Sequence, residues 1–188
     1  MSFPTASFSI AELLSSPFLL NIPVYQRPYS WGREHVEQLF DDLLEASGLA
    51  VQDDADPGYF LGTILLMDAP GNVTAKLTAK LSPREFDVVD GQLRLASLLT
   101  LFAVLRDLEK DTRKPVGKRV NPMLFAQLGS RFFRTERPRL HLAGADQALF
   151  EQSIMAPGSS VAMAATVQQD LPLLVARDLF RALSEELS

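Results

Sequence analysis

A short strand that passes directly into a long apolar helix constrains this chain most. Residues 85–89 have the apolar and β-branched character of a strand. Apolar residues with helical spacing follow, at Leu95, Leu98, Leu99, Phe102, Leu105 and Leu108. Residues 90–94, with the sequence DGQLR, separate the two patterns, so the strand must give way to the helix within this group. The chain therefore combines strands and helices in one fold.

The N-terminal segment predicts a short helix and a strand. Ser9 and Glu12 have the spacing of a capping box, in which each side chain satisfies a free backbone N–H, and Pro17 ends the helix. Residues 18–24 have strand character. Because proline cannot donate to a β-ladder, Pro23 predicts either an edge strand or the exit of the strand.

Two elements are expected between this strand and residues 85–89. An amphipathic helix is predicted over 32–47, with Gly48 as its C-terminal stop. The continuous apolar run at 59–67 predicts a strand buried on both faces, paired with 85–89.

The pattern after residue 111 is weaker. We expect, in order, a short strand over 139–142, a helix that Asp146 caps and that runs to about Ile154, a loop over 157–160 and an amphipathic helix over 165–188. No stop signal precedes the end of the last helix, so we expect either that the chain is the N-terminal part of a longer protein or that it ends in a natural C-terminus that frays.

Composition excludes several classes of site. The 188 residues include no cysteine, which excludes disulfides, thiolate metal centres and cysteine nucleophiles, and only two histidines. His35 is expected on a helix surface, and His141 is expected to face away from its apolar neighbours. No Walker-type phosphate loop is present. Without a signal peptide or an apolar run approaching ~18 residues, we expect a cytoplasmic protein that does not contact a membrane.

Charge is unevenly distributed along the chain. The formal net charge is −5, yet residues 106–139 carry ten Lys or Arg against four acidic residues. Such a stretch can bind a polyanion such as DNA, or it can form an ordinary solvated basic face. Both readings remain open from the sequence.

The 90–94 junction is the first candidate site. The free N–H groups and partial positive charge of a helix N-terminus bind phosphate. Gly91 would allow close approach of a ligand, Gln92 can orient a water, and the Arg94 guanidinium matches phosphate oxygens. Asp90 can hold a hydrated divalent cation. A plain structural account also stands: Asp90 as an N-cap, Gly91 as a turn residue and Arg94 as a solvated helix charge.

The second candidate is the loop 22–31, with the sequence IPVYQRPYSW. Its aromatic rings beside an arginine can stack a base while the guanidinium binds phosphate. The alternative is a loop held by rings that pack on the core, with Ser30 capping the next helix. Its candidate residues are Tyr25, Gln26, Arg27, Tyr29 and Trp31.

Four motifs occur in order: IPVYQRPYSW at 22–31, LFDDLL at 39–44, YFLGTILL at 59–66 and FDVVDGQLRLASLLTL at 86–101. Together they resemble the N-terminal domain of the GmrSD-type family of restriction and phage-defence proteins, whose signature reads I-P-x-Y-Q-R-x-Y-x-W, F-L-G and D-G-Q-Q-R-L. The resemblance covers about residues 8–108, with a weaker echo at 138–150.

The resemblance implies an α+β fold: a ParB/sulfiredoxin-like small mixed sheet flanked by helices, followed by a mostly helical C-terminal part. It divides the chain into a nucleotide-binding core over 1–111 and a mainly helical extension over 112–188. The family's DGQQR motif is implied to bind and hydrolyse a nucleoside triphosphate and to control a nuclease.

The implied roles fall on particular residues of this sequence. Asp90, Gln92 and Arg94 would be catalytic, with Asp90 also holding Mg²⁺. Gly91, Arg94, Gln26 and Arg27 would bind the nucleotide and its phosphates. Tyr25, Gln26, Arg27, Tyr29 and Trp31 would sense modified or foreign DNA, as the tyrosine-containing region is thought to do in phosphorothioate-sensing, SspE-like relatives.

This sequence departs from the family motif at Leu93, where the family has a second Gln. Leu93 cannot hydrogen-bond a phosphate or a water, so nucleotide binding is the firmer expectation and hydrolysis the weaker one. The histidines of an H-N-H nuclease are also missing, so any nuclease is expected in a C-terminal or partner domain.

Three functions follow as expectations. The first is an NTP-hydrolysing sensor domain of a modification-dependent restriction protein. The second is a non-catalytic ParB-like module that grips DNA with the 22–31 loop and the basic stretch 106–139. The third is a structural or interaction domain whose motifs only cap and pack.

Overall fold

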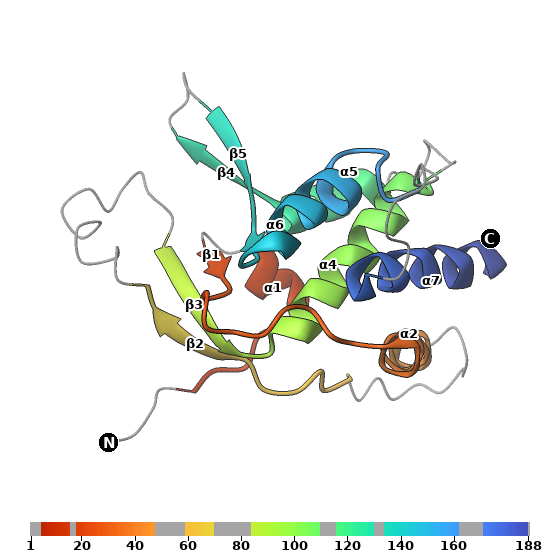
Figure 1. Ribbon diagram of the computed structural model, residues 1–188, viewed down its shortest axis with the longest axis horizontal. Coiled ribbons are helices and arrows are strands. Elements are labelled where there is room, and N and C mark those ends of the chain that lie inside the picture. Colours follow the sequence, from red (N-terminus) through yellow and green to blue (C-terminus); the bar gives the residue numbers. More distant parts are fainter. Residues whose placement is uncertain are drawn as a thin grey trace.

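The computed structural model describes residues 5–15, 18–47, 59–69, 84–109, 116–129, 134–161 and 171–187, and these form an α+β fold (Figure 1). A four-stranded mixed sheet has the strand order β2-β3-β1-β6, and a separate two-stranded ribbon joins β4 to β5. The α+β class is as expected.

Strand β1 (Phe18–Asn21) lies inside the sheet. It runs parallel to β3 (Arg84–Asp90) on one side and to β6 (Leu140–His141) on the other. Pro23 follows two residues after the strand ends, so of the two predicted placements the exit is correct and the sheet edge is wrong. Leu19 and Leu20 are both buried, as two-sided cover of a central strand requires.

Strand β2 (Leu65–Asp68) is the edge strand and pairs antiparallel with β3, as the predicted pairing requires. The prediction of a strand buried on both faces over 59–67 is wrong. The strand begins only at Leu65, and Leu65 and Met67 are exposed because β2 has one neighbour and an uncovered face. A run of apolar residues does not by itself distinguish a buried strand from an exposed one.

The first helix, α1 (Ile10–Ser15), has the predicted capping box. The Ser9 amide donates to the Glu12 carboxylate over 2.8 Å, and the Glu12 amide donates to Ser9 Oγ over 3.2 Å. These bonds lower the pKa of the Glu12 carboxyl.

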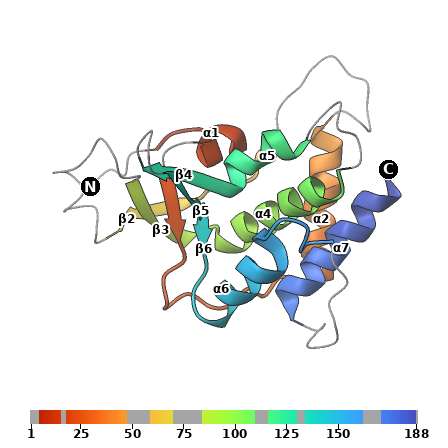
Figure 2. The same cartoon turned by 90° about the horizontal axis from the view of Figure 1, so that it is seen from above.

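Helix α4 (Gln92–Asp107) is the centre of the helical layer. It packs against α5 (Val116–Leu124) and α7 (Pro172–Glu186), and α7 packs in turn on α2 (Arg33–Ala46) (Figure 2). The helices predicted over 32–47 and 165–188 correspond to α2 and α7, although residues 165–170 lie outside the described residues.

Two polar residues in the middle of α4 are buried as well. Ser97 and Thr100 have no exposed surface, and each hydroxyl donates to the carbonyl four residues earlier, so neither is left unsatisfied. The full burial of Leu95 and Leu99 anchors this helix to the rest of the core.

The later part of the described chain contains an element that the sequence did not indicate. Strands β4 (Phe125–Gly129) and β5 (Arg134–Pro138) form a hairpin that stands out from the body (Figure 1). The predicted helix near 146–154 is present as α6 (Ala145–Phe150), which continues as one π-helical stretch (Glu151–Met155). Gly144 occupies its N-cap, so the capping role predicted for Asp146 is wrong.

The basic stretch 106–139 is not one solvated face. Arg106 and Arg139 are buried, with relative exposures of 8% and 7%. Arg106 pairs with Asp107 and donates to the carbonyl of Met155, and Arg139 donates to carbonyls of Pro122 and Phe18. Lys118, Arg119 and Arg137 are exposed, whereas Lys110, Arg113, Lys114 and Arg131 lie outside the described residues.

The hydrophobic core unites residues from both sides of position 111. Leu14, Leu20 and Leu99 share one cluster with Phe150 and Phe180. The division into units at 1–111 and 112–188 stays a prediction, but the two parts bury their apolar side chains against each other.

Candidate functional site

The junction between β3 and α4 is as tight as the sequence predicts. Strand β3 ends at Asp90, Gly91 is the N-cap, and α4 starts at Gln92. Gly91 has φ +96°, and a Cβ there would lie 3.1 Å from Cγ1 of Ile64. Only glycine meets both conditions without strain. Asp90 is the last residue of the strand, so its predicted N-cap role is wrong.

The N-terminus of α4 is open to an anion. The first intrahelical hydrogen bond runs from the Leu95 amide to the Gly91 carbonyl over 3.0 Å, so the amides of Gln92, Leu93 and Arg94 have no acceptor within the helix. Gly91 offers no capping side chain, and the first turn of α4 contains no acidic residue. Such an end attracts a negatively charged group.

The 22–31 loop is hydrogen-bonded to this junction. Gln26 Nε2 donates to the Val89 carbonyl over 2.9 Å, and Gln92 Nε2 donates to the Arg27 carbonyl over 3.2 Å. Because both acceptors are backbone carbonyls, they fix which end of each amide is the nitrogen. Loop and junction are therefore one unit, although they lie more than sixty residues apart in the sequence.

A pocket of about 370 Å³ opens at this unit. Its lining residues are Gln26, Arg27, Trp31, Val89, Asp90, Gly91, Gln92, Leu93 and Arg94. The lining contains two guanidinium groups and one carboxylate, and the positive end of the α4 dipole adds to the excess of positive charge. All the residues predicted to act on the nucleotide meet at this one pocket.

Arg94 is held in place from the side opposite its own helix. The side chain is half-buried, and Nη1 donates to the carbonyl of Thr63 over 3.2 Å. Gly62 has φ +98°, and a Cβ there would lie 2.9 Å from Arg94 Nη1. The guanidinium therefore occupies the space that the missing side chain leaves free, and the predicted alternative of a solvated helix charge is wrong.

The segment that supports Arg94 is itself tied to α2. The hydroxyl of Tyr59 donates to a carboxylate oxygen of Asp42 over 2.5 Å. This hydrogen bond raises the pKa of Tyr59, and the nearby positive charge of Arg94 opposes that rise. The LFDDLL motif at 39–44 therefore contacts the YFLGTILL motif at 59–66. The contact is made by Asp42 and Tyr59.

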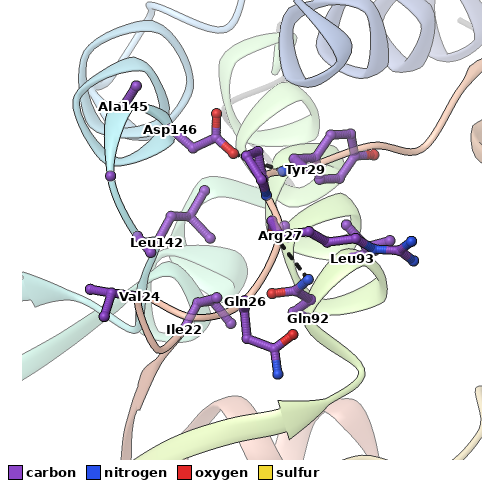
Figure 3. A pocket seen from close by; sticks show the side chains of 14 residues that line it. Ile22, Val24, Gln26, Arg27, Tyr29, Gln92, Leu93, Leu142, Ala145 and Asp146 are labelled. Atoms are coloured by element: carbon purple, nitrogen blue, oxygen red, sulfur yellow. Dashed lines mark hydrogen bonds between the residues drawn. The ribbon is translucent and has the colours of Figure 1, made fainter.

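A second pocket, of about 270 Å³, lies beside the first (Figure 3). It shares Gln26, Arg27, Gln92 and Leu93 with the junction pocket. The remaining lining residues are Ile22, Val24, Pro28, Tyr29, Ala96, Leu142, Ala143, Gly144, Ala145 and Asp146. Leu93 contributes apolar surface to both pockets, where the family motif would have an amide.

The aromatic residues of the loop have different roles. Tyr25 is 68% exposed, and Trp31 is half-buried and stacks on His35 with ring centroids 5.7 Å apart. Tyr29 is only 7% exposed, and its hydroxyl shares a 2.7 Å hydrogen bond with Ser97. The Tyr29 ring therefore anchors the loop and does not fit the direct DNA contact expected of it.

Burial has an electrostatic consequence at this anchor. Desolvation raises the pKa of Tyr29 to about 12, although the hydrogen bond to Ser97 acts in the opposite direction. The loop is anchored a second time by the Tyr29 amide, which donates to Asp146 Oδ2 over 2.7 Å (Figure 3).

Metal ligands are sparse at the junction. Within the part of the chain that the structure describes, no group of three or more His, Asp or Glu residues could hold a metal ion. Among the residues that the structure describes, Asp90 is the one carboxylate that lines the junction pocket. Mg²⁺ is commonly bound by one or two carboxylates together with substrate phosphates, so Asp90 fits a site that phosphates complete and not a preformed protein cage.

Three residues of this region were not identified as site residues from the sequence. Gly62 and Thr63 belong to the F-L-G-T segment, whose glycine was a usable signal, but nothing local connects it to Arg94. Asp146 was expected only as a helix cap, because its contact with Tyr29 spans 117 residues of sequence.

A family model described as the N-terminal domain of the GmrSD restriction endonuclease matches residues 10–171. That range covers the loop, the supporting segment, the junction and the strand and helix that follow the hairpin. No curated protein matches the chain. None of the described helices is both long and apolar enough to cross a membrane.

Proposed function

Because the chain belongs to the family of GmrSD restriction endonuclease N-terminal domains, we propose that the junction pocket binds the phosphates of a nucleoside triphosphate and thereby regulates a nuclease elsewhere in the system. Family membership gives the chain a role in a restriction, and hence phage-defence, protein. The observation that carries the proposal is the convergence of Arg27, Arg94 and the open N-terminus of α4 on one pocket.

Phosphate binding rests on complementary charge and geometry. The amides of Gln92, Leu93 and Arg94 offer donors that no helical carbonyl uses. The Arg94 guanidinium donates to Thr63 through Nη1 and keeps its remaining donors for a phosphate. Arg27 is exposed, lines the same pocket and supplies a second positive charge.

Hydrolysis would need a positioned water. The Gln92 amide nitrogen is bonded to the Arg27 carbonyl, so the amide oxygen is the end that can accept a hydrogen bond from an attacking water. Phosphoryl transfer depends mainly on positioning and charge stabilisation, so Gln92 and Arg94 need no protein nucleophile beside them. Mg²⁺, when bound by Asp90 and the phosphates, would neutralise phosphate charge. Leu93 takes no part beyond its backbone amide.

Coupling to DNA is proposed through the loop. Tyr25 and Arg27 are exposed beside the pocket, next to half-buried Trp31, and are suited to contact modified or foreign DNA. Any movement of the loop changes the Gln92–Arg27 hydrogen bond, so DNA contact and the nucleotide pocket share one link.

Calorimetric titration of nucleoside triphosphates with Mg²⁺, combined with a phosphate-release assay, tests the proposal. We expect Arg94→Ala to weaken triphosphate binding about ten- to a hundredfold, the value of a lost charge-assisted hydrogen bond. Asp90→Asn and Gln92→Ala should reduce phosphate release more than binding. Arg119→Ala, which removes the same charge from an exposed position on α5, is the matched control and should behave as wild type.

Two results would contradict the proposed phosphate site. If wild type, Arg94→Ala and Arg119→Ala bind triphosphate equally, the pocket is not a phosphate site. Steeply salt-dependent DNA binding that nucleotide does not affect would instead support a non-catalytic DNA-binding module. A DNA-binding module would use the basic stretch 106–139, but Arg106 and Arg139 of that stretch are buried and cannot contact a DNA backbone.

A further inference from the structure

The LFDDLL motif at 39–44 contains two adjacent aspartates, and the proposed function uses neither of them. Asp41 is exposed, whereas Asp42 is half-buried. Successive residues of a helix point about 100° apart, so the two carboxylates face different surroundings. They are therefore expected to differ in role although they share one chemistry.

Both carboxylate oxygens of Asp42 accept hydrogen bonds from side chains. Oδ1 accepts from Gln38 Nε2 over 2.6 Å, and Oδ2 accepts from the Tyr59 hydroxyl over 2.5 Å. Gln38 lies one turn earlier on α2, so its hydrogen bond fixes the rotation of the carboxylate and keeps Oδ2 directed at Tyr59. Hydrogen bonds to an ionised acceptor are roughly twice as strong as those between neutral groups.

Helix α2 is a firm support for this contact. Leu39 and Phe40, in the same motif as Asp42, are buried in the core. The Phe40 ring also packs against the ring of Phe180 on α7, with the ring centroids 6.3 Å apart. The apolar residues of the motif therefore fix the helix, and Asp42 connects the fixed helix to Tyr59.

The same side of α2 reaches the junction pocket at a second point. His35 lies seven residues before Asp42, which is two turns away on the same side of the helix. The His35 ring stacks on Trp31, which lines the junction pocket. Helix α2 thus supports a lining residue of the pocket through His35 and the 59–63 segment through Asp42.

Residues 59–64 form an extended connection that belongs to no helix or strand. At its far end Ile64 packs on the core and β2 begins at Leu65. At its near end Leu61 packs on the core and Tyr59 is bonded to Asp42. If the Tyr59 contact were lost, Leu61 would be the remaining support on that side.

The middle of this connection is the part that contacts Arg94. The Thr63 carbonyl accepts a hydrogen bond from Arg94 Nη1, and Gly62 leaves room for the guanidinium. Arg94 is also close to Tyr59: the hydrogen bond to Asp42 raises the pKa of Tyr59, and the charge of Arg94 acts in the opposite direction. A line of contacts therefore runs from α2 through the connection to the pocket.

We propose that Asp42 is a positioning residue of the junction pocket, which holds the Arg94 guanidinium in place for a phosphate through Tyr59 and the 59–63 segment. This inference rests on the proposed function, in which Arg94 binds phosphate. Asp42 lies outside the pocket lining, so it acts only through these other residues.

The sign of the effect distinguishes positioning from charge. The carboxylate of Asp42 is negative and by itself repels a phosphate, so its removal should strengthen anion binding on electrostatic grounds alone. If removal instead weakens binding, the loss comes from the displaced guanidinium. Asp41 supplies the comparison, because it carries the same charge at the next position of the same helix.

The test is a calorimetric titration of the full chain with ATP, GTP and inorganic tripolyphosphate in the presence of Mg²⁺. We expect Asp42→Ala to weaken each ligand that wild type binds about three- to tenfold, the value of one hydrogen bond. Tyr59→Phe should cause a similar loss. Asp41→Ala is the matched control and should bind at least as tightly as wild type.

A double-mutant cycle with Arg94 separates positioning from a general loss of structure. In an Arg94→Ala background, Asp42→Ala should cause no further loss of affinity, because no guanidinium remains to be positioned. A purely structural role would reduce affinity by the same factor in both backgrounds. Asp42→Asn keeps an oxygen that can accept the Tyr59 hydroxyl, so it should bind as wild type does. Thermal unfolding establishes that each variant is folded.

Three outcomes would contradict the inference. If Asp42→Ala binds as tightly as Asp41→Ala while Arg94→Ala binds less tightly, the role of Asp42 is wrong and the phosphate site stands. Equal losses from Asp42→Ala with and without Arg94 would also exclude that role. If wild type binds none of the three ligands, the proposed function fails and this inference fails with it.

Discussion

Gly62 illustrates how a residue without a side chain can set the position of a long one. Its backbone has φ +98°, and the Arg94 guanidinium lies where its Cβ would be. Arg94 is therefore fixed by two contacts outside its own helix, the carbonyl of Thr63 and the open face of Gly62. Arg94, the side chain proposed to bind phosphate, thus depends for its position on Gly62, which itself contacts no phosphate.

Gly62→Ala should displace the Arg94 guanidinium, because the added Cβ would lie 2.9 Å from Nη1 and the flexible end of the arginine moves more easily than backbone. We expect triphosphate affinity to fall at least about fivefold, and the free energy of unfolding to fall by about 1–2 kcal/mol from the left-handed backbone. Calorimetry and chemical denaturation measure the two effects.

Gly158→Ala is the matched control for this change. Gly158 also has a left-handed backbone, with φ +80°, but a Cβ there would meet nothing within 4 Å. It should lose similar stability and keep wild-type triphosphate affinity. Equal affinity losses in the two variants would show that backbone strain, and not the position of Arg94, is responsible.

Much of the candidate site was predictable from residues alone. The DGQLR group placed Asp90, Gly91 and Arg94 at a strand-to-helix junction because the hydrophobic period changes there. Gly62 and Asp146 were not predictable as site residues, because each acts on a partner that only the tertiary fold brings near. No local pattern contains that information.

At the scale of elements, the 22–31 loop depends on a buried phenol. Tyr29 ties the loop to α4 through Ser97 and to α6 through Asp146.

Helices α2, α4 and α7 were predictable because their apolar residues repeat with helical spacing over many residues. The β4–β5 hairpin was missed because its residues lack a clear alternation, and the edge position of β2 depends on a neighbour that the sequence cannot identify.

Tyr29 should make the protein sensitive to alkali. Its pKa is raised from 10.0 to about 12, so the neutral phenol is favoured in the folded state. The neutral Tyr29 phenol therefore contributes about 2–3 kcal/mol to the free energy of unfolding. This contribution is fully present below about pH 10 and is lost as the pH rises through about 12. Chemical denaturation from pH 8 to 12 should show a flatter alkaline decline for Tyr29→Phe, after a cost of about 1 kcal/mol at neutral pH.

The exposed Tyr25 provides the comparison. Tyr25→Phe should keep both the neutral stability and the alkaline decline of wild type, because the ring is 68% exposed. If the free energy of unfolding of Tyr29→Phe falls as steeply between pH 10 and 12 as that of wild type, a group other than Tyr29 is responsible for the loss of stability.

At the scale of the whole molecule, the two ends of the chain share one core. Strand β6 pairs with β1, and α7 covers α4 and α2. Arg139 adds a polar link, since it donates to carbonyls of Pro122 and Phe18. The α+β class was predictable from the motif order, whereas the place of β6 in the sheet was not, because two residues of strand leave almost no pattern.

Residues 1–111 should not fold alone. Without the rest of the chain, β1 loses its partner on one side, and Leu95 and Leu99 of α4 lose part of their cover. We expect the 1–111 fragment to give no cooperative thermal transition by circular dichroism, while the full chain unfolds in one step. A sharp transition of the fragment near that of the full chain would establish an independent unit there.

Gly91 has an evolutionary consequence. Its backbone rotation and the nearness of Ile64 both demand glycine, and neither demand involves a ligand. Descendants that had abandoned their chemistry would still be selected to keep this glycine in order to fold, while Gln92 and Arg94 would be released to drift. The presence of Gly91 therefore does not show that a copy of this domain is active. The loss of Gln92 and Arg94 beside it is the sign that the chemistry has been lost.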